Sequence, residues 1–332
     1  MPAISILMSV YNAATSLPST LDSIVSQSYT DWELIAVDDG STDGSLVILQ
    51  SWSAEDQRIK VLPLAHHGIV DALNVGLEHV TAPLIARMDA DDVMHTHRLE
   101  KQYDYMLRNP DVGVVSSLVR HVGDESQKGY ARHVAWINGL ISHEEMAVNR
   151  FVDAPIANPS VMFRAECIRD YGGYRKGDFP EDYEFWLRWL EAGVRMAKVP
   201  EVLLDWHDGP GRITRHHPMY RDEAFTNIKA PYLMRWLEQH NPYHPQVVVW
   251  GAGRKSRKRL QPLLDLGLKV VAYIDIKSEG RQLDAPVINY RNIGTLKDVF
   301  VLSIVNKIGA QKEICEYLEK HDFVLGKNFI VT

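Results

Sequence analysis

The 332-residue sequence is poor in cysteine, since it has only Cys167 and Cys315, far apart and without the spacing of metal ligands. So few thiols give no zinc or disulfide framework and fit a reducing cytoplasm. No apolar run approaches the roughly 20 residues of a membrane-spanning helix. The start, MPAISILMSVYN, has no basic segment before a long apolar stretch, which argues against a signal peptide. We therefore expect a soluble cytoplasmic protein, at most peripheral to the inner face of the cell membrane.

The sequence also lacks an excess of basic residues, and its net charge is −7. This argues against a general nucleic-acid binder, because affinity for phosphates needs a basic surface. Hydrophobic residues make up 45% of the chain and charged residues 24%, which is ordinary for a globular protein. The length suffices for one large domain or for two with separate cores.

Strand-like and helix-like patterns alternate through the first half. A continuous apolar run of strand length occurs at residues 4–10, and further strand-like segments lie at residues 33–37, 59–63 and 84–88. Stretches with helical spacing of apolar residues lie between them. Such alternation predicts an α/β fold with a parallel sheet and helices on both faces.

Polar clusters follow three of these predicted strands, at residues 9–12, at Asp38-Asp39 and at residues 89–92. Ligands of such sheets collect at the carboxyl ends of the strands. Each cluster alone could be turn or cap chemistry, whereas the three together favour a binding site.

The last cluster, in LIARMDADD, places three carboxylates within four residues, Asp89, Asp91 and Asp92. Unit charges about 4 Å apart repel by roughly 1 kcal/mol in water and by more in a partly buried site. A cation bound there would relieve the repulsion, and Mg²⁺ prefers such oxygen ligands. We expect Asp92 to be structural, as a helix cap or an acceptor behind the ligands.

Six segments resemble, in order, the motifs of family-2 glycosyltransferases, which have the GT-A fold: SILMSVYNA, ELIAVDDGSTDGS, GIVDALNVGL, ARMDADD, NPSVMFRAE and DFPEDYEFWLRWLEAG. The resemblance covers roughly residues 1 to 230. It implies an inverting transferase that uses a nucleotide-activated sugar, with UDP as the leading nucleotide, and a divalent metal, Mn²⁺ or Mg²⁺. The acceptor would be a hydroxyl group of a glycan, a lipid-linked sugar or a protein, in the synthesis of bacterial surface polysaccharide or glycoconjugates.

Carried over by position, the resemblance implies a donor site made of Ser9, Tyr11, Asn12, Asp38, Asn74, Asp89 and Arg212. Ser9, Tyr11 and Asp38 would line the base and ribose. Asp89 and Asp91 would be the Asp-x-Asp metal motif, with His207 as a further candidate ligand. The Trp206-His207 pair departs from the family's usual aromatic-Arg-x-His pattern. Arg212 or Arg215 could pair with phosphate oxygens.

A transferase of this kind also needs a base, because the attacking hydroxyl loses its proton as the new bond forms. The resemblance assigns this task to the Glu181-Asp182 pair, usually to its second member. The segment PEDYEFWLRWL reads as a loop entering a helix with an apolar face. The two carboxylates could instead only favour the positive end of that helix.

A polar linker with two prolines, HNPYHPQ, separates a predicted transferase domain, residues 1–240, from a small Rossmann-like α/β domain, residues 246–332. In the second part, Gly251 and Gly253 match the first glycines of a dinucleotide fingerprint, and Ser256 replaces the third. So short a domain favours a structural or acceptor-recognition role over that of an oxidoreductase. The cations of residues 254–259 could bind an anion at a helix start or form a solvated face.

Two other functions compete with sugar transfer. A sugar nucleotidyltransferase can share the N-terminal architecture, but it normally has a glycine-rich loop after the first strand, and SVYNAATS has no glycine. The second is a non-enzymatic binding or scaffold protein, against which the intact acidic motifs argue. The product released separates the three functions. A glycosyltransferase releases UDP from its donor, a nucleotidyltransferase releases pyrophosphate from UTP, and a binding protein releases neither.

Overall fold

The computed structural model describes residues 1–123, 128–209, 217–276, 283–306 and 308–332. The chain forms two compact units. The first contains residues 1–146, 155–177 and 188–215, and the second contains residues 147–154, 178–187 and 216–332.

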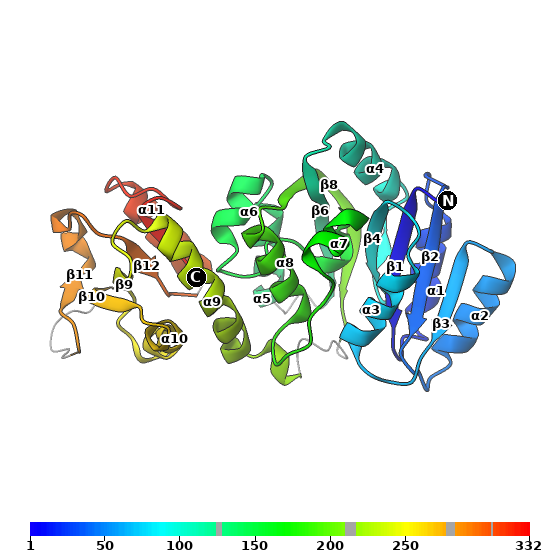
Figure 1. Ribbon diagram of the computed structural model, residues 1–332, viewed down its shortest axis with the longest axis horizontal. Helices are drawn as coiled ribbons and strands as arrows, with labels where there is room; N and C mark the ends of the chain where they lie inside the picture. The colour runs from blue at the N-terminus through cyan, green and yellow to red at the C-terminus, as the bar shows by residue number, and fades with distance from the viewer. Residues whose placement is uncertain (124–127, 210–216, 277–282, 307) are drawn as a thin grey trace. The chain divides into compact units, whose positions relative to one another are not determined.

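The first unit contains an eight-stranded sheet with the order β3-β2-β1-β4-β7-β6-β8-β5 (Figure 1). Its strands are β1 (Ile4–Val10), β2 (Trp32–Asp38), β3 (Ile59–Pro63), β4 (Leu84–Asp89), β5 (Val93–Met94), β6 (Val112–Gly123), β7 (Met162–Arg164) and β8 (Arg195–Asp208). The first four strands run parallel, as do β6 and β8, whereas β7 and β5 are antiparallel to their neighbours. The predicted mostly parallel α/β sheet is therefore confirmed.

The helices of the first half lie on both faces of this sheet, as predicted. They are α1 (Leu17–Val25), α2 (Ser45–Glu55), α3 (Ile69–His79) and α4 (Arg98–Arg108). Residues of α1 such as Leu21 and Ile24 share a core with Ile6 and Met8 of β1. Ala72 of α3 packs in a separate cluster on β2. Four further helices follow: α5 (Lys128–Asn138), α6 (His143–Asn149), α7 (Ala165–Tyr171) and α8 (Glu181–Glu191).

One buried carboxylate ties the amino ends of the parallel strands together. Glu33 of β2 is 4% exposed and accepts hydrogen bonds from the Ser5 hydroxyl at 2.6 Å, the Thr81 hydroxyl at 2.7 Å and the Lys60 ammonium at 2.6 Å. Burial opposes ionisation, but the hydrogen bonds from Lys60, Ser5 and Thr81 outweigh it and lower the pKa of Glu33 to about 2.

Replacing Glu33 with glutamine should lower the free energy of unfolding at pH 7 by about 3 kcal/mol, from the pKa difference between the folded and unfolded states. Because the folded pKa is depressed, this stabilisation is complete above the unfolded value of 4.5 and is lost as the pH falls towards 2. Urea unfolding at pH 7 and at a pH near 2 should show that the difference in unfolding free energy between wild type and variant shrinks in acid. The exposed Glu55→Gln variant is the control, and an equal effect of both would refute this account.

The second unit contains a five-stranded, wholly parallel sheet with the order β11-β10-β9-β12-β13. Its strands are β9 (Gln246–Trp250), β10 (Lys269–Asp275), β11 (Val287–Asn289), β12 (Val301–Ser303) and β13 (Phe329–Val331), and its helices are α9 (Asp222–His240), α10 (Arg254–Asp265) and α11 (Ile308–Glu319). One face of the sheet packs with α9 and α10, and the other packs with α11. This is the small parallel α/β arrangement that the sequence predicted.

Helix α9 belongs to the same compact unit as this sheet. Its residues Leu233, Trp236 and Leu237 share a core with Val247 and Val249 of β9. That residues 1–240 and 246–332 are separate domains remains a prediction. Within the described ranges, we find no helix with the length and apolar character required to traverse a bilayer.

Candidate active site

The register of three neighbouring strands brings the predicted polar clusters to one edge of the first sheet. Strand β1 lies between β2 and β4, with Ser9 opposite Asp89 and Val10 opposite Asp38. All three strands are parallel, so their carboxyl ends meet at this edge. Ser9, Asp38 and Asp89 therefore lie on adjacent strands, although they are separated along the chain.

Asp38 has a buried carboxylate oxygen that the protein leaves unsatisfied. The residue is 1% exposed, and its Oδ2 accepts a hydrogen bond from the backbone N–H of Ser41 at 3.1 Å. Its Oδ1 has no hydrogen-bond partner among the described residues. A buried acceptor without a donor costs roughly 1 to 3 kcal/mol, so this oxygen is suited to receive a donor from a ligand.

An aromatic stack lies at the same edge. The rings of Tyr11 and His66 are 4.1 Å apart with an interplanar angle of 16°, and Tyr11 is 48% exposed. Nδ1 of His66 lies 2.8 Å from the carboxylate of Asp39. That carboxylate also accepts the backbone N–H groups of His67 and Gly68. The sequence did not single out His66, because its partners come from two other loops.

Two residues predicted to bind the sugar donor, Asn12 and Asn74, form hydrogen bonds with the backbone of other loops. The Asn12 side chain accepts a hydrogen bond from the backbone of Thr42 at 2.8 Å. The Asn74 amide both donates to and accepts from the backbone of Tyr174, at 2.9 and 3.0 Å. These contacts join loops, and the predicted contacts of both residues with a donor stay predictions. Arg212 lies outside the described residues.

The acidic turn after β4 groups three carboxylates. One oxygen from each of Asp89, Asp91 and Asp92 lies within 4.8 Å of the others. Asp91 is exposed, Asp89 is half-buried and Asp92 is 1% exposed. Clustered carboxylate oxygens are the ligands that hard divalent cations prefer, so the turn fits a divalent metal. Asp91 is the most accessible of the three carboxylates.

Asp92 is a buried hydrogen-bond acceptor, in agreement with one of the two structural roles expected of it. Its Oδ1 accepts the backbone N–H of His207 at 2.8 Å, which joins the turn to β8. The alternative of a helix cap is wrong, because α4 begins at Arg98 and its N-cap is His97.

Two buried guanidinium groups lie beneath the turn and offset its negative charge. Nη2 of Arg87 lies 2.6 Å from the carboxylate of Asp89, and Arg87 is fully buried. Arg98, also fully buried, donates to the carbonyl of Arg87 at 2.8 Å. Burial lowers the pKa of Arg98 to about 9, while the charge of Asp92 opposes that shift. The two guanidinium groups therefore offset part of the repulsion among the three carboxylates.

His207 lies beside this turn, as its predicted role requires. Its Nδ1 is 4.0 Å from Oδ1 of Asp92. That nitrogen is buried, and none of the residues the structure describes forms a hydrogen bond with it. A buried imidazole nitrogen of this kind can bind a divalent metal. The cluster of close ligand atoms consists of the three aspartates, so the role of His207 as a further ligand stays a prediction.

The Glu181-Asp182 pair starts helix α8, as the sequence indicated. Glu181 is 3% exposed and accepts a hydrogen bond from the Tyr220 hydroxyl at 2.8 Å. Asp182 is partly exposed, and its Oδ1 accepts the backbone N–H of Tyr183 at 2.7 Å. Asp182 is thus the more accessible carboxylate, whereas Glu181 is buried and held by the Tyr220 hydroxyl. Trp186 and Trp189 of this helix are fully buried core residues.

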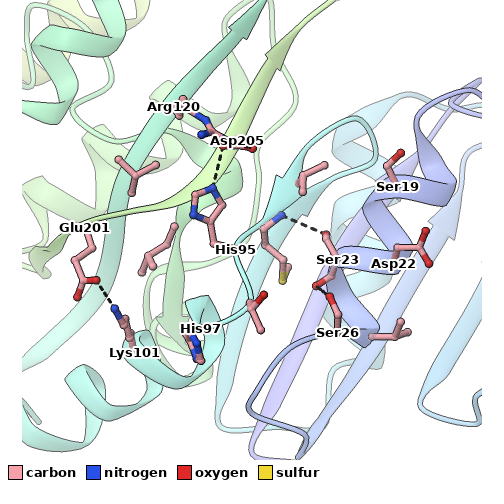
Figure 2. A pocket seen from close by; sticks show the side chains of 16 residues that line it. Ser19, Asp22, Ser23, Ser26, His95, His97, Lys101, Arg120, Glu201 and Asp205 are labelled. Atoms are coloured by element: carbon pink, nitrogen blue, oxygen red, sulfur yellow. Dashed lines mark hydrogen bonds and ion pairs between the residues drawn. The ribbon is translucent and has the colours of Figure 1, made fainter.

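A separate pocket of about 1020 Å³ lies along α1, β5 and β8 (Figure 2). Asp205 interacts there with both His95 and Arg120, and Lys101 pairs with Glu201. The charged side chains of the lining are thus largely paired with one another. None of the predicted donor or metal residues lines this pocket.

A family model and individual relatives agree on the family to which this chain is similar. The model of the family Glycosyl transferase family 2 matches residues 5–172. An uncharacterized glycosyltransferase of Haemophilus influenzae is 30% identical over 245 residues, which are 72% of this chain and 75% of that protein. The UDP-Gal:alpha-D-GlcNAc-diphosphoundecaprenol beta-1,3-galactosyltransferase of Escherichia coli is 31% identical over 236 residues, 70% of this chain and 82% of the relative.

Solved structures with a similar fold are glycosyltransferases of low sequence identity. S. aureus TarS 1-349 in complex with UDP-GlcNAc matches with a TM-score of 0.57 and 16% identity, over 79% of this chain and 70% of that one. The mannosyltransferase PcManGT from Pyrobaculum calidifontis, in complex with GDP-Man and Mn²⁺, matches with a TM-score of 0.51 and 19% identity. The match covers 80% of this chain and 68% of that one. These likenesses establish the GT-A fold that the sequence motifs implied.

Proposed function

The chain belongs to glycosyl transferase family 2, and we propose that it transfers a sugar from a UDP-sugar to a hydroxyl group of a glycan or lipid-linked acceptor, with inversion at the anomeric carbon. One observation carries the proposal. The register of β1 with β2 and β4 aligns the unsatisfied carboxylate of Asp38 and the acidic turn along one sheet edge. A nucleoside diphosphate has hydroxyl and imino donors at one end and metal-binding phosphates at the other.

We propose that the base and ribose bind at Ser9, Tyr11 and Asp38. His66, held by Asp39, stacks on one face of the Tyr11 ring, and the exposed part of Tyr11 offers a surface on which a base could stack. The free Oδ1 of Asp38 would accept a hydrogen bond from the nucleoside, which removes the penalty of an unsatisfied buried oxygen.

The proposed metal ligands are Asp89, Asp91 and His207, for Mn²⁺ or Mg²⁺. Their chemistry supports this choice, because the acidic turn supplies hard oxygens and the buried Nδ1 of His207 has no hydrogen-bond partner among the residues that the structure describes. The complex of PcManGT with Mn²⁺ is consistent with it. A bound divalent ion would neutralise the charge that develops on the leaving diphosphate.

Asp182 is the proposed base that takes the proton of the acceptor hydroxyl. Its partial exposure supports the assignment, as does the different environment of Glu181, whose carboxylate accepts the Tyr220 hydroxyl. Glu181 would then fix the start of α8 and hence the backbone that carries Asp182.

The acceptor and setting are proposed from relatives. The Escherichia coli relative is named for a sugar linked to diphosphoundecaprenol. We propose that this chain likewise acts in surface polysaccharide synthesis, at the cytoplasmic face of the membrane where lipid-linked sugars are exposed.

A thermal-shift screen of UDP, GDP, dTDP and their sugars, with and without Mn²⁺, tests the proposal. A UDP-sugar with Mn²⁺ should give the largest rise in melting temperature, since a ligand at 100 times its Kd stabilises the native state by about 2.7 kcal/mol. Asp38→Asn should reduce the shift, because a hydrogen bond to a charged group contributes about 1.5 to 3 kcal/mol. The exposed Glu55→Gln variant should not change it. The absence of a shift with every nucleotide would contradict donor binding.

A further inference from the structure

Charge is divided unevenly along the chain. Residues 246–332 contain 14 lysine and arginine residues against 9 aspartate and glutamate residues, a net charge of +5, whereas the whole chain carries −7. The preceding 245 residues therefore carry −12. A basic module attached to an acidic one indicates a specific anionic partner for the basic part.

The first turns of α10 concentrate this positive charge. Five of the six residues from 254 to 259 are cationic. Lys258 pairs with Glu223, and Arg259 pairs with Asp222 at 2.8 Å, both on α9. The other three, Arg254, Lys255 and Arg257, are exposed and have no ion-pair partner within the described part of the chain.

An exposed apolar side chain lies at the same edge of the sheet. Ile276, directly after β10, is 68% exposed. The neighbouring Asp275 accepts the backbone N–H of Ala252 at 3.0 Å, and α10 begins two residues after Ala252. We call the four residues Arg254, Lys255, Arg257 and Ile276 the α10 patch.

We propose that the α10 patch docks the protein on a membrane surface of anionic phospholipids. Three unpaired cations suit lipid phosphates, and the positive end of the α10 dipole adds to their attraction. Ile276 can enter the boundary between headgroups and acyl chains, as apolar side chains do in interfacial segments. A nucleic acid fits less well, because it offers no apolar layer for Ile276. This proposal does not depend on the transfer reaction.

Vesicle flotation of the full chain tests the proposal. The vesicles are phosphatidylcholine alone, or phosphatidylcholine with about one third phosphatidylglycerol, at about 0.05 M and 0.5 M salt. The protein should bind only the anionic vesicles, and less at high salt. Replacing Arg254, Lys255 and Arg257 with glutamine should weaken binding about 100-fold, given roughly 1 kcal/mol for each cation. Adding Ile276→Ser to the triple variant should weaken vesicle binding further at both salt concentrations.

A matched control makes the same change of charge elsewhere in the module, with Lys312, Lys320 and Lys327 replaced by glutamine, all three exposed. This control should bind like wild type, and circular dichroism verifies that each variant folds. Arg254→Gln alone replaces the triple variant if the latter does not fold. Equal binding to neutral and anionic vesicles, or equal losses in patch and control variants, would overturn the proposal. Tighter binding to a DNA duplex, insensitive to Ile276→Ser, would overturn it as well.

Discussion

Replacing Asp91 with asparagine should reduce turnover by at least about 100-fold, since stabilisation of the leaving group by a bound metal amounts to several kcal/mol and each 1.36 kcal/mol is tenfold in rate. Asp91 is the exposed member of the acidic turn, so the fold should tolerate the change. An asparagine offers a neutral oxygen in place of a charged one and leaves more of the leaving-group charge uncompensated. Donor affinity in the presence of Mn²⁺ should fall together with turnover.

Calorimetric titration of a UDP-sugar with and without Mn²⁺, paired with single-turnover rates, measures both effects. The control is Asp104→Asn on α4, whose carboxylate is exposed and pairs with Arg108 away from the turn. The metal assignment is wrong if the Asp91 variant keeps the metal dependence of the wild type.

The strands around this turn were predictable because a parallel strand covered on both faces must be apolar throughout. The runs at residues 4–10 and 84–88 lie in β1 and β4, whose residues are nearly all buried. The meeting of Ser9, Asp38 and Asp89 also followed from the sequence, since parallel strands end at one edge. Only the motifs, however, indicated which of the polar residues there would bind a ligand.

Contacts between distant loops were not predictable. The partner of Asn74 is 100 residues away in the sequence, and that of Asn12 is 30 residues away. Position in a motif cannot show that such an amide joins two loops. Arg87 offered a usable signal, because a guanidinium inside the buried run LIARM must be paired. Its partner, Asp89, is only two residues away, so the pair could have been inferred from the strand itself.

The packing partner of α9 was hard to predict, because this helix carries apolar residues that either part of the chain could bury. The polar linker at residues 240–246 suggested a boundary after α9. In the structure, Leu233 and Trp236 of that helix pack with Val249 of β9. Composition marks where a chain is polar and turns, but the partner of an amphipathic helix depends on which sheet has a complementary apolar face.

Replacing Asp182 with asparagine should separate binding from chemistry. The shape of the side chain is kept but its basicity is lost, so turnover should drop by the roughly 10² to 10⁴ typical of a missing general base. Donor and metal affinity should remain near those of the wild type, in contrast to Asp91→Asn.

Glu181→Gln is the matched control for Asp182→Asn, since it removes the adjacent carboxylate from the same helix start. Glutamine keeps an oxygen that can accept the hydroxyl of Tyr220, so α8 should keep its start and turnover should fall only mildly. Single-turnover rates and calorimetric donor titrations of both variants distinguish the roles. Near-normal turnover of Asp182→Asn would show that Asp182 is not the base. An equally large loss with Glu181→Gln would show that Asp182 does not remove the proton on its own. A pH–rate profile adds an independent readout, because the loss of a base should abolish the acid limb of the wild-type profile, whereas a shift in helix position should only lower the rate at every pH.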